Sequence, residues 1–252
     1  MKFRENLTKD LYKVLRQTLY IGRKKEDVLK QLPEKAVNII WLDFENDKLK
    51  SIYETTKQEV LKTIKKEKQL NTSTFTQAVA EINKIRQILS KIKVHEFMNF
   101  IDIWYEDNPN DKAVIFAYFV ETQEELYHRL SKKFPGGQVL KLTADMPAEK
   151  RKEIVMQFQE NDNIKYLVIS LMAGKEGLNL TKATTAFFID LDWTPANLEQ
   201  AENRLHRIGQ KNFVNIYYFL VKNSLDEYMW NKLTYKENII KAIIENPEEA
   251  II

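Results

Sequence analysis

Residues 113–120 read AVIFAYFV, an unbroken apolar run with the length of one β-strand. Other apolar runs of strand length follow at Val139–Leu142, Lys165–Ser170, Thr185–Asp190 and Phe213–Val221. Strands that are apolar throughout are typical of a parallel sheet covered on both faces. Helical patterns separate or follow them at Thr122–Phe134, Pro147–Gln159, Pro195–Ile208 and from Ser224 onward. The sequence therefore predicts an α/β fold, with a parallel sheet and helices on both of its faces.

The part of the chain before the sheet has a different pattern. Apolar residues recur at helical spacing among lysines and glutamates over Phe44–Leu70, Phe75–Lys91 and Val94–Tyr105. A short extended stretch, Ala36–Leu42, precedes them. We therefore expect a helical arm in front of the sheet domain. The expected divisions are an N-terminal segment with an extended linker (1–43), a helical linker or protrusion (44–110), and the sheet domain with its C-terminal helix (111–252).

The composition excludes several classes of protein. The chain has 252 residues and no cysteine, which rules out a disulfide framework, a thiolate metal site and a cysteine nucleophile. The three histidines are scattered and have no carboxylate cluster, so no metal site is expected. No apolar run has the roughly 18 residues that a membrane span needs, and no membrane partner is expected. The net charge of +3 does not by itself indicate nucleic-acid binding.

The loop that follows Ser170 reads LMAGKEGLNL and contains two of the six glycines, Gly174 and Gly177. Backbone N–H groups that glycines expose can hold a phosphate. The loop is not a P-loop, because Glu176 stands where Ser or Thr is required and Ile169 where the first glycine should be. The residues alone leave two interpretations open, a phosphate-binding loop and a tight strand-to-helix turn.

The segment Pro195–Ile208 carries an amphipathic pattern. Its apolar residues keep 3-4-3 spacing and are expected to pack on the sheet: Leu198, Ala201, Leu205 and Ile208. The opposite side carries Gln200, Arg204 and Arg207, and neither arginine has an acidic residue four positions away. Two arginines and an amide on one stripe, expected at the carboxyl edge of the sheet, are suited to bind an oxyanion. An ordinary solvated face is the alternative.

Three more residues near this segment have expected roles. Asp190 ends a strand in the manner of a Walker B motif, but without a P-loop we interpret it as a strand-end cap or loop anchor. Trp193 comes just before the helix and is either a partly buried plug or an exposed contact. His206 falls away from the arginine stripe and is expected to be structural.

Several segments resemble the motifs of the Swi/Snf-type ATPases of helicase superfamily two. The run QAENRLHRIGQ (200–210) resembles motif VI, and AGKEGLNLTKA (173–183) resembles motif V. AVIFAYF is similar to motif IV, and RKKEDVLKQLPEK (23–35) is similar to the stretch that ends the first lobe in this family. The resemblance covers residues 22 to about 236 and is nearest to the annealing-helicase-like branch.

The resemblance implies the second of two RecA-like lobes, with the tail of the first lobe in residues 1–43. In the family, ATP with Mg²⁺ lies between the lobes and is held mainly by the first one. The implied catalytic residues are Arg204, Arg207 and Gln200, and the implied cofactor-binding residues are Gly177 and Asn179. The implied DNA-backbone contacts are Thr143, Ser170, Gly174, Lys175 and Trp193. The implied partners are double-stranded DNA and the first lobe.

The chain departs from the family pattern in several places. Asn203 stands where the family usually has Asp, Ala144 where it usually has glycine, and Ala117 where it often has a small hydroxyl residue. No G-x-x-x-x-G-K-[ST] motif occurs, so we expect the chain to be inactive as an ATPase without a first lobe. The alternative is a non-catalytic module that binds nucleic acid or protein. The expected location is the cytoplasm, with the nucleoid, in a microbe or phage, and the nucleus in a eukaryote.

Overall fold

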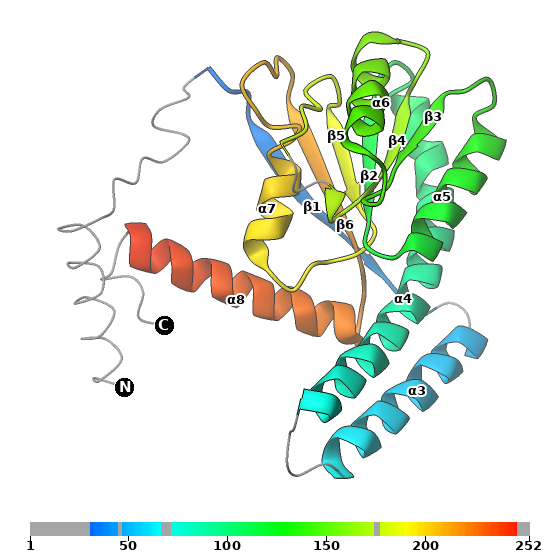
Figure 1. Cartoon of the computed structure of the whole chain (residues 1–252), viewed down its shortest axis with the longest axis vertical. Helices are drawn as coiled ribbons and strands as arrows, with labels where there is room; N and C mark the ends of the chain where they lie inside the picture. Colours follow the sequence, from blue (N-terminus) through cyan, green and yellow to red (C-terminus); the bar gives the residue numbers. More distant parts are fainter. Residues whose placement is uncertain (1–30, 45–46, 67–71, 174–176, 246–252) are drawn as a thin grey trace.

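A computed structural model describes residues 31–44, 47–66, 72–173 and 177–245 (Figure 1). Its centre is a six-stranded parallel sheet in the order β1-β6-β5-β2-β4-β3. The strands are β1 (Lys35–Leu42), β2 (Ala113–Ala117), β3 (Val139–Leu142), β4 (Tyr166–Ser170), β5 (Thr185–Phe188) and β6 (Val214–Val221). The helices are α3 (Asp47–Lys66), α4 (Thr72–Asp107), α5 (Val120–Lys133), α6 (Ala148–Glu160), α7 (Pro195–Glu202) and α8 (Leu225–Glu245). The predicted α/β class is confirmed, and the fold is RecA-like.

Both faces of the sheet are covered, which explains why its central strands are apolar throughout. Every residue of β2, β4 and β5 is buried. Alternate residues of β2 enter different cores: Val114 and Phe116 pack with residues of α6, α7 and α8, whereas Ile115 packs with residues of α4 and α5. Because these strands are buried on both faces, their sequences do not alternate between apolar and polar residues.

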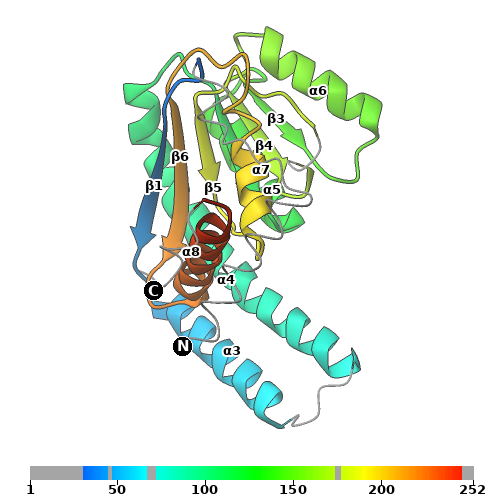
Figure 2. The same ribbon diagram turned by 90° about the vertical axis from the view of Figure 1, so that its left-hand side faces the viewer.

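The helical arm is built by α3 and by one long helix, α4, where the sequence predicted two helices. The expected break falls at Ile92 and Lys93, and both residues are buried against the body of the protein. Because packing continues through this point, the helix does not end there. The C-terminal half of α4 lies on the sheet through Phe97 and Trp104, and its N-terminal half extends past the sheet beside α3 (Figure 2).

The extended stretch predicted at Ala36–Leu42 is part of the sheet. It forms β1, which pairs with β6 in parallel register from Lys35 opposite Val214 to Leu42 opposite Val221. The sheet therefore takes in a strand from the segment that precedes the helical arm. The expected divisions of the chain after residues 43 and 110 stay predictions.

The helix predicted at Pro195–Ile208 is wrong in its length, because α7 ends at Glu202. Beyond it the backbone carbonyls bond to other groups: that of Arg204 accepts the N–H of Leu180 at 3.0 Å, and that of Leu205 accepts the Gln210 side-chain amide at 3.3 Å. These bonds replace the helical ones. Residues 203–209, here called the arginine turn, follow instead, and the turn closes on Gly209 with φ +105°.

The described residues also bear on whether the chain has a membrane-spanning helix or a metal site. No helix in the described ranges is long and apolar enough to cross a membrane. Within the same ranges, no group of three or more His, Asp or Glu side chains is arranged to hold a metal ion.

Candidate functional site

The arginine turn carries the two arginines that the sequence singled out. Arg204 is partly buried, whereas Arg207 and Gln200 are exposed. Burial, followed by the nearby positive charge of Arg207, lowers the pKa of Arg204. The two guanidinium groups are thus close enough to repel each other, and an oxyanion placed between them would be stabilised.

The expected place of these arginines at the carboxyl edge is wrong. Only the start of α7 lies at that edge, and the chain then runs back along the sheet. Glu202, the last residue of α7, contacts Lys35 at the amino end of β1. The arginine turn itself contacts Pro33 through His206, and Leu180 ahead of β5 through the Arg204 carbonyl. It therefore lies on the sheet face that α6 and α7 cover, toward the amino ends of the strands.

Buried polar contacts hold the arginine turn in place. At the end of α7, Glu202 accepts hydrogen bonds from the Lys35 Nζ at 2.5 Å and from the Tyr218 hydroxyl at 2.7 Å. Burial and then the charge of Glu202 raise the pKa of Tyr218 well above its ordinary value, so its hydroxyl keeps its proton. The His206 Nε2 lies 2.7 Å from the Pro33 carbonyl oxygen, which agrees with the structural role expected for His206.

The loop segment Gly177–Asn179 lies directly beside this turn, because the next residue, Leu180, donates its N–H to the Arg204 carbonyl. Gly177 and Asn179 are exposed, and with α6 they line a hollow of about 430 Å³. A Cβ built on Gly177 would meet no atom of the described chain within 4 Å. The structure thus brings the predicted catalytic and cofactor-binding residues to one face. Gly174 lies outside the described residues.

Three of the predicted DNA contacts, Thr143, Ser170 and Trp193, are among the described residues, lie at the carboxyl edge and differ in exposure. Thr143 and Ser170 are buried, with 9% and 4% exposed. The Thr143 hydroxyl hydrogen-bonds Asp145 and lowers the pKa of that carboxyl. Trp193 as a whole residue is 38% exposed, so it is partly buried and also reaches the surface. Lys175 lies outside the described residues.

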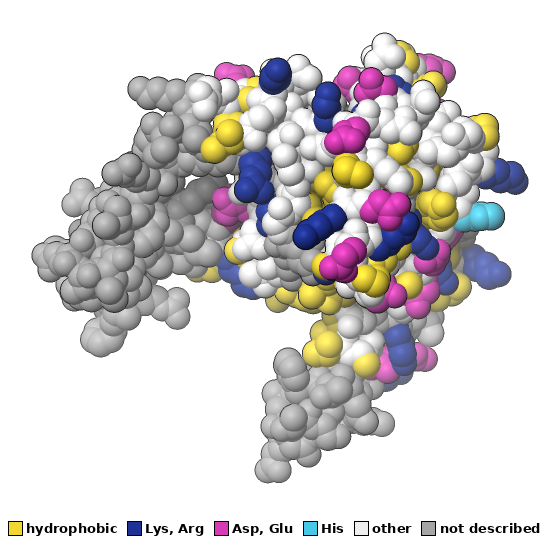
Figure 3. Space-filling model, turned by 45° about the horizontal axis from the view of Figure 1, so that its top comes forward, with side chains coloured by type: hydrophobic (Ala, Val, Ile, Leu, Met, Phe, Trp, Pro, Cys, Tyr) yellow, Lys and Arg dark blue, Asp and Glu magenta, His cyan; other side chains and the backbone are white. Residues whose placement is uncertain are grey.

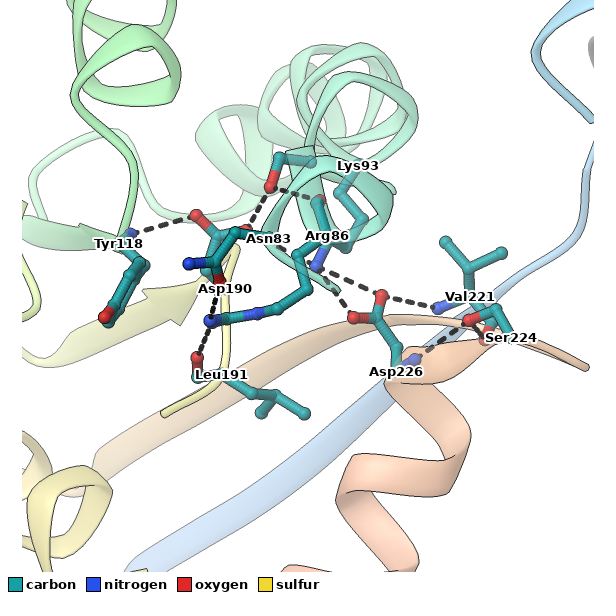
Figure 4. A network of polar contacts seen from close by, with 10 residues as sticks. Asn83, Arg86, Lys93, Tyr118, Asp190, Leu191, Val221, Ser224 and Asp226 are labelled. Atoms are coloured by element: carbon teal, nitrogen blue, oxygen red, sulfur yellow. Dashed lines mark hydrogen bonds and ion pairs between the residues drawn. The ribbon is translucent and has the colours of Figure 1, made fainter. Parts of the chain in front are cut away.

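A buried polar network joins α4 to this edge (Figure 4). Asp190 accepts the Tyr118 N–H at 2.9 Å and the Ser90 hydroxyl, so the structure confirms it as a loop anchor. Lys93 bridges Asp190 and Asp226 at 3.5 and 3.1 Å. Sequence reasoning missed Arg86, which joins the same network. The available signal was a polar 3-4-3 series on an otherwise apolar helix, consisting of Asn83, Arg86, Ser90 and Lys93.

Charge is mixed over the face of the molecule seen in Figure 3. Figure 3 shows acidic and basic side chains interspersed over the face that it presents. This fits the small net charge of +3. Any attraction for an anion therefore depends on local groups such as the arginine turn rather than on the overall field.

A six-stranded parallel sheet with an arginine-bearing turn after α7 defines a RecA-like lobe of the helicase type. Residues 92–209 match the family described as "Helicase conserved C-terminal domain". Residues 92–209 therefore carry this domain, which supports the predicted resemblance to the C-terminal lobe of the Swi/Snf-type ATPases.

Known relatives and a solved structure support this assignment. The chain is 28% identical, over 94% of its length, to a Caenorhabditis elegans homolog of SWI/SNF-related matrix-associated actin-dependent regulator of chromatin subfamily A-like protein 1. It is 26% identical, over 92% of its length, to the Bos taurus DNA annealing helicase and endonuclease ZRANB3. The Sulfolobus solfataricus SWI2/SNF2 ATPase core in complex with dsDNA matches 96% of this chain with a TM-score of 0.68 and 20% identity.

These proteins are longer than the chain. It spans 33% of the nematode relative, 21% of the bovine one and 53% of the archaeal ATPase core. At 20% identity the solved structure shows the shared fold alone.

Proposed function

We propose that the chain is the second motor lobe of an ATP-dependent double-stranded DNA translocase, completed by a first RecA-like lobe. ATP and Mg²⁺ are held mainly by that first lobe in this account. Arg204 and Arg207 act as arginine fingers on the transferring phosphoryl group, and Gln200 lies near the same phosphate. The observation that carries the proposal is the neighbouring pair of guanidinium groups on a turn fixed by buried contacts.

The neighbouring loop supports the proposal. The φ of Gly177 is not positive, so its backbone conformation does not require a glycine. The space that a Cβ would occupy at this position is nevertheless open. Open space over a backbone without a Cβ suits the close approach of a ligand. The archaeal relative was solved with double-stranded DNA, and the bovine relative is named a DNA annealing helicase. Both favour duplex DNA as the partner. The nematode relative is named a regulator of chromatin, which favours a nuclear location if the source is a eukaryote.

The test is reconstitution of the nucleotide site. The chain alone is expected to show no ATP turnover with or without duplex DNA, because half of the site lies elsewhere. Joined to a first RecA-like lobe, it is expected to gain turnover that duplex DNA stimulates. Turnover by the chain alone would contradict the two-lobe account, and a joined protein that binds ATP without hydrolysing it would favour the alternative, a non-catalytic binding module.

A further inference from the structure

The polar face of α4 is directed at the loops of the carboxyl edge rather than at solvent. Asn83, Arg86, Ser90 and Lys93 share this face, and the last three are at least 95% buried. The same helix continues into the arm that extends beyond the sheet (Figure 2). The arm is therefore fixed to the edge of the lobe by specific polar contacts as well as by apolar packing.

Arg86 is the member of this face that holds the loop carrying Trp193. Its Nη2 donates to the Leu191 carbonyl at 2.5 Å, and its Nη1 donates to Asn83 Oδ1 at 3.3 Å. The guanidinium carbon lies 5.9 Å from the centre of the Trp193 ring and 4.5 Å from that of Tyr118. The guanidinium group of arginine is planar, so it can stack on aromatic rings while its N–H groups donate hydrogen bonds in the same plane. The ammonium group of lysine is not planar and cannot do both.

The rest of the network fixes the ends of the same loop. Asp190, where β5 leaves the sheet, is held by Ser90 and Lys93 of α4. At the other end, Asp192 Oδ1 accepts the Thr194 N–H at 2.9 Å, just before α7 begins. The Trp193 carbonyl also accepts a hydrogen bond of 3.2 Å from Lys236. Arg86 therefore contacts the loop between its two fixed ends, at the Leu191 carbonyl and at the Trp193 ring.

We propose that Arg86 is a positioning residue that holds the Trp193 ring in the orientation in which it contacts duplex DNA. The inference rests on the proposed function, since it takes Trp193 as a DNA contact. Arg86 itself is 4% exposed and touches no phosphate in this account. It also couples the arm to the lobe, because a movement of α4 moves Leu191 and Trp193 with it.

The test is binding of this chain to a duplex of about 30 base pairs, with Kd measured over a range of salt concentrations. Arg86→Lys keeps the charge and loses the planar fork, so Kd is expected to rise about three- to tenfold with the salt slope unchanged. Lys84→Ala is the control, since Lys84 is exposed on the same helix and is expected to leave Kd unchanged.

A double-mutant cycle separates positioning from direct contact and from unfolding. In a Trp193→Ala background, Arg86→Lys is expected to have no further effect on Kd, because the ring that it positions is gone. Thermal unfolding identifies variants that fail to fold. If Arg86→Lys fails to fold, Asn83→Ala is used in its place. Asn83→Ala removes only the acceptor of the Arg86 Nη1 group, so it is expected to raise Kd by a smaller factor.

The outcomes distinguish this inference from the proposed function. Additive effects of the two substitutions, a folded Arg86→Lys variant that binds like wild type, or unchanged binding by Trp193→Ala would overturn the positioning role while the motor function stands. Wild-type chain that does not bind duplex DNA, or binds it without dependence on salt, would instead contradict the DNA partner of the proposed function.

Discussion

The Nζ of Lys35 lies 2.5 Å from Oε2 of Glu202, although the two residues are 167 positions apart in the chain. Lys35 begins β1, and Glu202 ends α7 directly before the arginine turn. The contact therefore joins the chain segment that enters the sheet to the segment that carries Arg204. A displacement of one segment would therefore displace the other.

Tyr218 provides a test of how firmly the arginine turn is held. Tyr218→Phe removes the buried hydrogen bond to Glu202 but keeps the ring and the Lys35 contact. Because the acceptor is charged, we expect the free energy of unfolding to fall by about 1.5–3 kcal/mol in urea titration. Tyr228→Phe is the control, since Tyr228 is 55% exposed and is expected to leave stability unchanged. Equal stability of the two variants would show that the bond to Glu202 does not stabilise the fold.

Lys93 balances two buried carboxylates. Lys93→Met leaves Asp190 and Asp226 without their shared cation, and near pH 7 we expect a loss of about 3–5 kcal/mol. Lys91→Met, at an exposed position on the same helix, is the control. A loss in the control as large as that for Lys93 would rule out a specific role for the buried cation.

The cost of removing Lys93 is expected to depend on pH. Burial raises the pKa of Asp226, and Lys93 opposes that effect. Without the lysine the pKa rises further in the folded state. A carboxyl whose pKa is higher folded than unfolded favours folding while protonated, at pH below its unfolded value, and that contribution is lost as pH rises through the folded pKa. Urea unfolding should therefore show a smaller loss at acidic pH than at neutral pH, and the same loss at both would contradict this origin.

Gly177 and Gly209 should respond differently to alanine. Gly209 has φ +105°, a conformation that costs an L-residue about 1–2 kcal/mol, so Gly209→Ala is expected to lower stability by that amount. Gly177→Ala should change stability by less than about 0.5 kcal/mol, because no described atom lies within 4 Å of the added Cβ. In a two-lobed motor, Gly177→Ala should nevertheless lower ATP turnover. Full turnover would show that no ligand approaches this backbone.

Salt should weaken DNA binding by the chain in a regular way. If the contacts are to the phosphate backbone, log Kd for duplex DNA rises linearly with log salt, by about 0.9 for each phosphate neutralised. Scrambled duplexes of equal length should bind with similar Kd, because such contacts carry no sequence information. A strong preference for one sequence would indicate base contacts that the account lacks.

The strands were predictable from sequence because burial on both faces leaves unbroken apolar runs, but the run AVIFAYFV is longer than its strand: β2 ends at Ala117, and Val120 begins α5. The length of α7 was not predictable. Leu205 is buried as its spacing predicts, but Ile208 is 60% exposed, because Leu180 and Gln210 take the carbonyls that would continue the helix. Leu180 is distant in the chain, and Gln210 uses its side chain, so neither hydrogen bond can be recognised from the spacing of apolar residues.

The candidate site was predictable in part, for a similar reason. Motif-like residues such as Arg204 and Asn179 could be singled out along the chain, and the fold brings their segments together. Arg86 was missed, although it belongs to a polar 3-4-3 series on α4, because a polar residue on a helix is ordinarily exposed. Its burial depends on a loop that lies far along the chain, since Arg86 and Leu191 are 105 positions apart. The pairing of Lys35 with Glu202 is hidden from sequence in the same way.

The proposed motor function depends most on the arginine turn acting on ATP. The decisive measurement is single-turnover hydrolysis of bound ATP, with duplex DNA present, in a motor that joins this lobe to a first RecA-like lobe. Arg204→Ala and Arg207→Ala are predicted to slow hydrolysis about 1,000-fold or more while nucleotide affinity stays within about threefold. Lys211→Ala, at an exposed position nearby, should hydrolyse ATP like wild type. Undiminished hydrolysis in the arginine variants would contradict the account.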